Sequence, residues 1–132
     1  MTDDRAVQPS KPLVLVVEDE PILRIANVAL IEDLGYATVE AADASEALEI
    51  LEHRVDIRIV FTDIDMPGGM SGTMLAAAIR ERWPPIDIIL TSGATIPAAE
   101  LVPERGLFLE KPVSDRSIER ALNNFAPGLL PI

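Results

Sequence analysis

Several residue types are scarce in this 132-residue sequence, and each scarcity excludes a class of chemistry. There is no cysteine, which excludes disulfides, thiolate metal sites and cysteine nucleophiles. The one histidine, His53, cannot by itself supply a histidine metal cluster or histidine-based catalysis. No apolar run approaches the roughly 20 residues of a membrane helix, and the polar N-terminal segment lacks the apolar stretch of a secretory signal. We therefore expect a cytoplasmic protein with no membrane partner.

Positive charge is scarce as well. The sequence has 11 Lys and Arg residues against 22 Asp and Glu, which gives a formal net charge of −11. Such a surface repels a polyanion, and no basic cluster with interleaved aromatic residues offsets the repulsion, so we expect no nucleic-acid partner. Divalent cations and basic protein surfaces remain compatible with this charge.

Short apolar runs alternate with segments of helical period along most of the chain. The runs cover residues 14–17, 36–41, 57–61, 86–90 and 107–109. Strands that are apolar on both faces and separated by helices indicate a parallel sheet covered on both sides. We expect a single α/β domain over residues 12–126, with a flexible segment at 1–11 and a tail at 127–132.

The helical segments carry start and stop signals. Pro21 and Gly35 bound the first predicted helix, and Asp43 with Glu46 forms a capping-box pattern at the second. Ser114 is the expected cap of the last helix. Three helices carry residues whose spacing predicts that they face inward: Leu23, Ala26, Leu30 and Leu34 in the first helix; Leu75, Ala78 and Ile79 in the third; and Ile118, Ala121, Leu122 and Phe125 in the last.

The fourth helix is expected to be short or irregular, because Pro97 and Pro103 interrupt its segment.

Polar residues follow four of the five predicted strands directly. They are Glu18 and Asp19 after the first, Asp63 after the third, Thr91 and Ser92 after the fourth, and Lys111 and Pro112 after the fifth. In an open parallel sheet, ligands bind beyond the carboxyl ends of the strands. Adjacent carboxylates repel one another, and a divalent cation such as Mg²⁺, which prefers oxygen ligands, would offset that repulsion.

Four motifs in this order, "VVEDEP", "FTDIDMPGGMSG", "ILTSG" and "FLEKP", resemble the receiver domain of two-component response regulators. The resemblance covers nearly the whole chain. It implies a flavodoxin-like fold like that of the chemotaxis response regulator, with strand order 2-1-3-4-5. It also implies a stand-alone receiver that is a phosphoacceptor and not a turnover enzyme.

The resemblance also implies roles for individual residues. Asp63 would accept a phosphoryl group from the phosphohistidine of a histidine kinase or phosphotransfer protein, with Lys111 and Thr91 contacting that group. The expected Mg²⁺ ligands are Glu18, Asp19, Asp63 and the main-chain carbonyl of Asp65. Thr91, preferred over Ser92, and Phe108 would form the switch that an unknown downstream protein detects. Pro112 would follow a cis peptide bond. Asp65 and Gly93 lie where the family tunes the rate at which the phosphoryl group is hydrolysed.

Two other functions remain open at this stage. A receiver-like interaction module that does not use phosphate would show loss of Asp63, an acid or Lys111, and none is lost. The "VFTDIDM" segment also resembles the Asp-x-Asp strand of haloacid-dehalogenase-type phosphatases. In that family the Asp-x-Asp strand comes first, whereas here the pair Glu18 and Asp19 precedes it.

The segment "MPGGMSG" is one residue longer than the common receiver pattern.

Overall fold

A five-stranded parallel sheet forms the centre of the computed structural model, which describes residues 12–125 apart from 67–68, 94–96 and 98. The sheet has the order β2-β1-β3-β4-β5, as the resemblance implies, so the predicted fold is confirmed. The strands are β1 (Leu13–Val17), β2 (Ala37–Ala41), β3 (Ile57–Asp63), β4 (Asp87–Ser92) and β5 (Gly106–Glu110). The predicted terminal segments, 1–11 and 127–132, lie outside the described residues.

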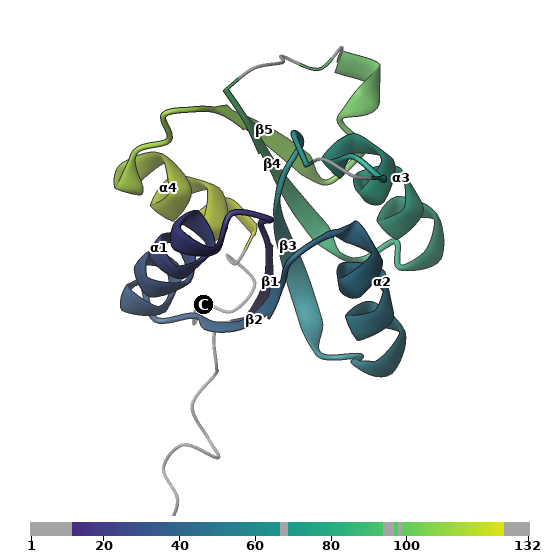
Figure 1. The fold of residues 1–132 in the computed structure, drawn as a ribbon, viewed down its shortest axis with the longest axis horizontal. Helices are drawn as coiled ribbons and strands as arrows, with labels where there is room; N and C mark the ends of the chain where they lie inside the picture. The colour runs from purple at the N-terminus through teal and green to yellow at the C-terminus, as the bar shows by residue number, and fades with distance from the viewer. Residues whose placement is uncertain (1–11, 67–68, 94–96, 98, 126–132) are drawn as a thin grey trace, which may run out of the picture.

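Helices cover both faces of this sheet (Figure 1). One face carries α1 (Pro21–Asp33) and α4 (Asp115–Phe125), and the other carries α2 (Ala44–His53) and α3 (Gly72–Arg82). The helices α1, α2 and α3 each connect two parallel strands, which cannot be joined by a tight turn, and α4 follows the last strand. No helix in the described part of the chain is long and apolar enough to cross a membrane.

The continuous apolar run of β1 divides between two cores. Leu15 and Val17 pack into the cluster beneath α2 and α3, while Val14 and Val16 pack into the cluster beneath α1 and α4. Successive side chains of a strand point to opposite faces, so a strand covered on both faces needs apolar residues at every position. The same requirement explains the runs in β3 and β4.

Two predicted caps hold helix starts in place. The Glu46 N–H donates to Oδ1 of Asp43 at 2.8 Å, and Oε1 of Glu46 accepts from the N–H of Ala42 at 2.6 Å. The Ser117 N–H donates to Oγ of Ser114 at 3.0 Å. Both caps are therefore confirmed, and each satisfies a backbone N–H that the helix itself cannot pair.

The predicted inner face of α1 is wrong at its N-terminal half. Leu23 is 36% exposed and Ala26 is also exposed, whereas Ile31 is fully buried and Val28 packs against the same cluster. The apolar side chains of the N-terminal half of α1 are thus exposed, and those of its C-terminal half pack on the core cluster.

In α3 the prediction of the inner face is incomplete because it omitted Ala76. Ala76 is buried beside Leu75 and Ile79, while Ala78 is half-buried. The expectation of a short fourth helix is confirmed. Among the described residues between β4 and β5, the one helical segment is the single turn η2 (Ala99–Leu101).

Candidate functional site

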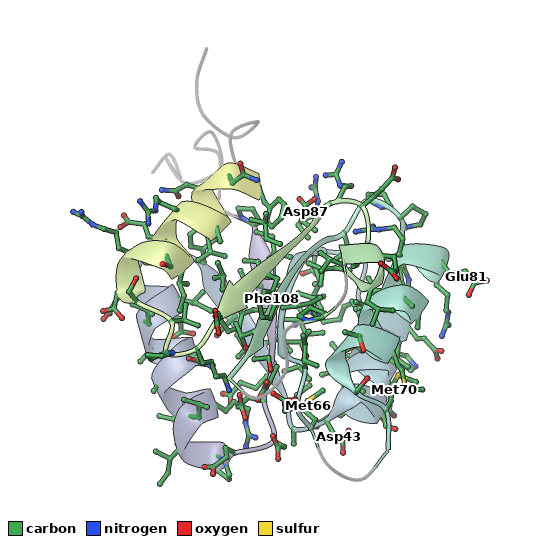
Figure 2. The ribbon with its side chains drawn as sticks, turned by 90° about the horizontal axis from the view of Figure 1, so that it is seen from above. Asp43, Met66, Met70, Glu81, Asp87 and Phe108 are labelled. Atoms are coloured by element: carbon green, nitrogen blue, oxygen red, sulfur yellow. The ribbon has the colours of Figure 1, made fainter. Side chains whose placement is uncertain are left out.

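Five parallel strands bring their carboxyl ends to one edge of the sheet, and the predicted site residues gather there. In Figure 2, Met66, which follows β3, lies near Asp43, which follows β2. Asp87, the first residue of β4, lies at the opposite end of the sheet. Side chains that are far apart in sequence but directly follow strands therefore meet at the edge marked by Met66.

Asp63, the last residue of the central strand β3, lies at the middle of this edge and is 5% exposed. Its Oδ2 accepts from Nζ of Lys111 at 3.0 Å, and its Oδ1 accepts from the N–H of Asp65 at 3.1 Å. Each carboxylate oxygen thus has a donor from a different segment. The ion pair between Lys111 and Asp63 therefore connects the end of β5 to the end of β3.

Two further acids complete a cluster with Asp63. One oxygen from each of Glu18, Asp19 and Asp63 lies within 4.8 Å of the others. Burial raises the pKa of Glu18 to about 7; the Glu20 N–H, 3.2 Å from its Oε2, and Lys111 act to lower the pKa, while the charge of Asp63 acts to raise it. The carboxylates of this cluster repel one another, and a bound cation would offset that repulsion.

The acid cluster opens onto a cavity of about 510 Å³. Its lining includes Glu18, Asp19, Asp63, Asp65 and Lys111. Asp63 is therefore buried by its neighbours and yet lines an open cavity.

Thr91 and Ser92 end β4 beside Asp63 but have different surroundings. Thr91 is the strand partner of Asp63, is 3% exposed, and lines a second cavity of about 740 Å³ together with Lys111. The Ser92 hydroxyl donates to Oδ2 of Asp65 at 2.5 Å. This contact, which the sequence did not predict, engages the Ser92 hydroxyl, whereas Thr91 lines the same cavity as Lys111.

The remaining predicted positions lie on β5 and just after it. Phe108 is half-buried against the core cluster beneath α2 and α3. The Lys111–Pro112 peptide bond is cis, as expected. The Lys111 N–H donates to the carbonyl of Ser92 at 2.9 Å, which fixes the lysine's main chain to β4.

Gly72, at the start of α3, packs directly on the backbone of Asp63. A Cβ atom at this position would lie 2.2 Å from the carbonyl oxygen of Asp63. Any larger residue would therefore displace the end of β3. A close backbone approach of this kind is a common reason for glycine, and the sequence analysis did not identify it.

Sequence reasoning also missed Arg24. This α1 residue donates from Nη1 to the carbonyl oxygen of Glu18 at 2.7 Å. A single arginine on a helix carries no sequence signal that distinguishes it from a solvated surface residue.

Comparisons with known proteins agree on the kind of domain this is. Residues 14–123 match the family described as the response regulator receiver domain. The chain is 41% identical over 81 residues to the sensor kinase CckA of Brucella abortus (strain 2308), which covers 61% of the chain and 8% of that protein. It is 39% identical over 71 residues to the aerobic respiration control protein ArcA of Escherichia coli (strain K12), covering 54% of the chain and 29% of ArcA.

A solved structure, the response regulator receiver domain protein of Clostridium thermocellum, superposes with a TM-score of 0.81 at 27% identity. That superposition covers 86% of this chain and 93% of the other. By contrast, the chain spans less than a third of the length of the curated relatives named above.

Proposed function

Because the chain belongs to the response regulator receiver domain family, a signalling module of two-component systems, we propose that Asp63 is its phosphoacceptor. The phosphoryl donor is the phosphohistidine of a histidine kinase or phosphotransfer protein. One observation carries the proposal. The carboxylate of Asp63 is held between Lys111 and the Asp65 N–H, within 4.8 Å of oxygens of Glu18 and Asp19, and it faces a cavity.

The family match confirms the resemblance drawn from the four sequence motifs. The assignment of individual residues goes further than the family match. It is supported by the way the fold brings together Asp63, Lys111, Glu18, Asp19 and Thr91, which stand on β1, β3, β4 and β5 or directly after them.

In the proposed reaction an oxygen of Asp63 attacks the phosphorus of the phosphohistidine. The new P–O bond forms as the P–N bond breaks, and its electron pair returns to the imidazole of the donor. Lys111, 3.0 Å from Oδ2 of Asp63, offsets the negative charge of the phosphoryl oxygens. Catalysis here consists of positioning and charge neutralisation.

The acid cluster fits a magnesium ion. Mg²⁺–oxygen distances of about 2.0–2.1 Å place adjacent ligand oxygens about 3 Å apart and opposite ones about 4.2 Å apart. The oxygens of Glu18, Asp19 and Asp63 lie within 4.8 Å of one another, so small side-chain rotations suffice. We assign the ion to these three carboxylates and the main-chain carbonyl of Asp65. When bound, the ion would supply positive charge that offsets the negative charge of the acids and of the transferred phosphoryl group.

Phosphorylation would add about −1.5 to −2 charge and three acceptor oxygens. The Thr91 hydroxyl, opposite Asp63 in the sheet, is the proposed donor to that group. Phe108 on β5 is the proposed second switch residue, and a downstream protein would detect the changed face. The proposed location is the cytoplasm, where the kinase would deliver the phosphoryl group.

The two competing functions are less well supported. A module that does not use phosphate has no need for a lysine held on a buried aspartate beside two more acids. A haloacid-dehalogenase-type phosphatase would have its Asp-x-Asp on the first strand, whereas Asp63 ends the third. We therefore propose that the protein undergoes stoichiometric phosphorylation and not many-turnover hydrolysis.

The direct test is the intact mass of the full chain after incubation with Mg²⁺ and a small-molecule phosphodonor. The mass is expected to rise by one phosphoryl group, and Asp63→Asn is expected to abolish the rise. Asp56→Asn is the matched control. Asp56 is exposed and immediately precedes the opposite end of the same strand, so this variant is expected to be phosphorylated like the unchanged protein.

Three results would contradict the proposal. They are phosphorylation of Asp63→Asn to the same extent, no mass increase with the small donor or with purified histidine kinases, and continuous phosphate release from phosphomonoesters. The second result favours the interaction module, and the third favours the phosphatase.

A further inference from the structure

Arg24 connects three elements next to the acid cluster. Its Nη1 donates to the carbonyl oxygen of Glu18 at 2.7 Å, and its Nε donates to Oε1 of Glu40 at 3.2 Å. Glu18 directly follows β1, Arg24 lies in α1, and Glu40 lies in β2. The arginine side chain is only 20% exposed, although it is charged and close to the protein surface.

The segment held by Arg24 is under electrostatic stress. Residues 18–20 form the whole connection between β1 and α1, and all three are acids. One oxygen of Glu18 and one of Asp19 each lie within 4.8 Å of an oxygen of Asp63. Repulsion among these carboxylates acts to push the connection away from β3.

Main-chain contacts of Glu18 oppose that displacement on both sides. Its N–H donates to the carbonyl of Ala41 at 3.1 Å, and its carbonyl accepts from Arg24. The first contact continues the β1–β2 pairing. The second depends entirely on one side chain.

Arginine suits this position better than lysine. The guanidinium presents N–H groups from different nitrogens in a fixed fork, so one donates to Glu18 while another donates to Glu40. The carboxylate of Glu40 thereby holds the guanidinium through a second nitrogen. A lysine has one nitrogen on a flexible stem and would hold the two acceptors less rigidly.

We propose that Arg24 is a positioning residue for the magnesium site. It sets the position of the Glu18 and Asp19 carboxylates before the ion arrives. Arg24 does not touch the ion, and it acts through the main chain of Glu18. This inference depends on the magnesium site of the proposed function. Partners that orient metal ligands typically affect metal affinity about 10- to 100-fold when removed.

The test is calorimetric titration of the full chain with MgCl₂, for the unchanged protein and for Arg24→Gln and Arg24→Lys. We expect Arg24→Gln to raise the Kd for Mg²⁺ about tenfold or more, and Arg24→Lys to raise it less. Thermal unfolding with EDTA and with excess Mg²⁺ is measured in parallel. The stabilisation by Mg²⁺ at a fixed concentration is expected to shrink in step with the affinity.

Arg82→Gln is the matched control. Arg82 of α3 also makes an ion pair with a glutamate of a neighbouring element, Glu52 of α2, at 2.7 Å, and it lies over the ring of Trp83. The Arg82→Gln variant loses one guanidinium and one ion pair but no contact to residues 18–20. Its affinity for Mg²⁺ is therefore expected to equal that of the unchanged protein.

Glu40→Gln tests whether the contact between Glu40 and the Arg24 guanidinium contributes to Mg²⁺ binding through Arg24. Alone it is expected to weaken Mg²⁺ binding less than Arg24→Gln, because the contact to Glu18 remains. Combined with Arg24→Gln it is expected to have no further effect.

The inference is overturned if Arg24→Gln lowers the unfolding temperature in EDTA but leaves the Kd for Mg²⁺ unchanged, since Arg24 is then only a structural residue. If Arg24→Gln does not fold, the Arg24→Lys and Glu40→Gln variants test the inference instead. An unchanged Mg²⁺ affinity in both variants overturns the inference. If the unchanged protein binds no Mg²⁺, the magnesium site itself fails, and that result is distinguishable because it needs no variant.

Discussion

Tyr36 shows how one residue outside the site couples the protein's stability to pH. It is the only tyrosine in the chain, is 3% exposed, and donates from its hydroxyl to Oδ1 of Asn123 in α4 at 3.1 Å. Burial raises the pKa of this phenol above its ordinary value, and the nearby charge of Glu119 acts in the same direction. The folded protein therefore keeps the proton on Tyr36 at a pH where the unfolded chain has lost it.

The Tyr36 ionisation gives a testable pH dependence. An unfolded tyrosine titrates near pH 10, so above about pH 10 the unfolded state loses a proton that the folded state retains. Stability is then lost as pH rises from about 10 through the folded pKa. Absorbance of the phenolate in the folded protein is expected to appear with a midpoint above 10. Tyr36→Phe is the control and should remove this component, while a midpoint at or below 10 would contradict the assignment.

The residues of the candidate site differ in how far sequence could predict them. Asp63 ends a strand, and Lys111 and the pair Glu18 and Asp19 follow strands. Parallel topology brings these strand ends together, so their meeting was predictable. Arg24 was not, because its two acceptors depend on the exact rotation of α1. Local sequence contains no information on that rotation.

At the level of elements, the same limit explains the error in α1. The helix has apolar residues on more than one side, including the exposed Ile22 and Ile25, so a three- and four-residue spacing is present along several stripes. Periodicity identifies a helix, but which stripe packs depends on where the helix crosses the sheet. The starts of α2 and α4 were predictable because caps are local interactions.

The cap of α2 gives a prediction at this scale. Asp43→Ala leaves the Glu46 N–H without its 2.8 Å acceptor and is expected to reduce the free energy of unfolding by about 1 kcal/mol. Urea denaturation of both proteins measures the difference. Asp43→Asn is expected to retain most of the stability, because asparagine also accepts this hydrogen bond.

Glu49→Gln is the matched control for that cap. Glu49 is exposed on the same helix, and its substitution is expected to change stability by less than about 0.5 kcal/mol. Equal losses in Asp43→Ala and Glu49→Gln would show that helix charge, and not the cap, is responsible.

For the whole molecule, a net charge of −11 makes self-repulsion a general cost to folding. Part of that cost is concentrated at Glu18, Asp19 and Asp63. Monovalent salt screens the distributed repulsion, whereas Mg²⁺ would also bind the cluster. The effect of charge screening on stability can therefore be measured separately from the effect of Mg²⁺ binding.

We expect monovalent salt to raise the unfolding temperature modestly and Mg²⁺ at equal ionic strength to raise it further. At a concentration about 100 times its Kd, the ion would add about 2.7 kcal/mol of stability. Asp19→Asn is expected to keep the response to salt and to lose most of the response to Mg²⁺. In EDTA it should be no less stable than the unchanged protein, because one repulsive charge is gone. Equal Mg²⁺ responses in the two proteins would contradict a site at the cluster.

The distribution of the site along the chain has a consequence for protein synthesis. Glu18, Asp19 and Asp63 stand in the first half of the sequence, whereas Lys111 follows the last strand. A nascent polypeptide released from the ribosome only as far as α3 would present three acids without their lysine counter-charge. Under the proposed function, competence to receive a phosphoryl group would thus be acquired late in translation, once β5 has been added to the edge of the sheet.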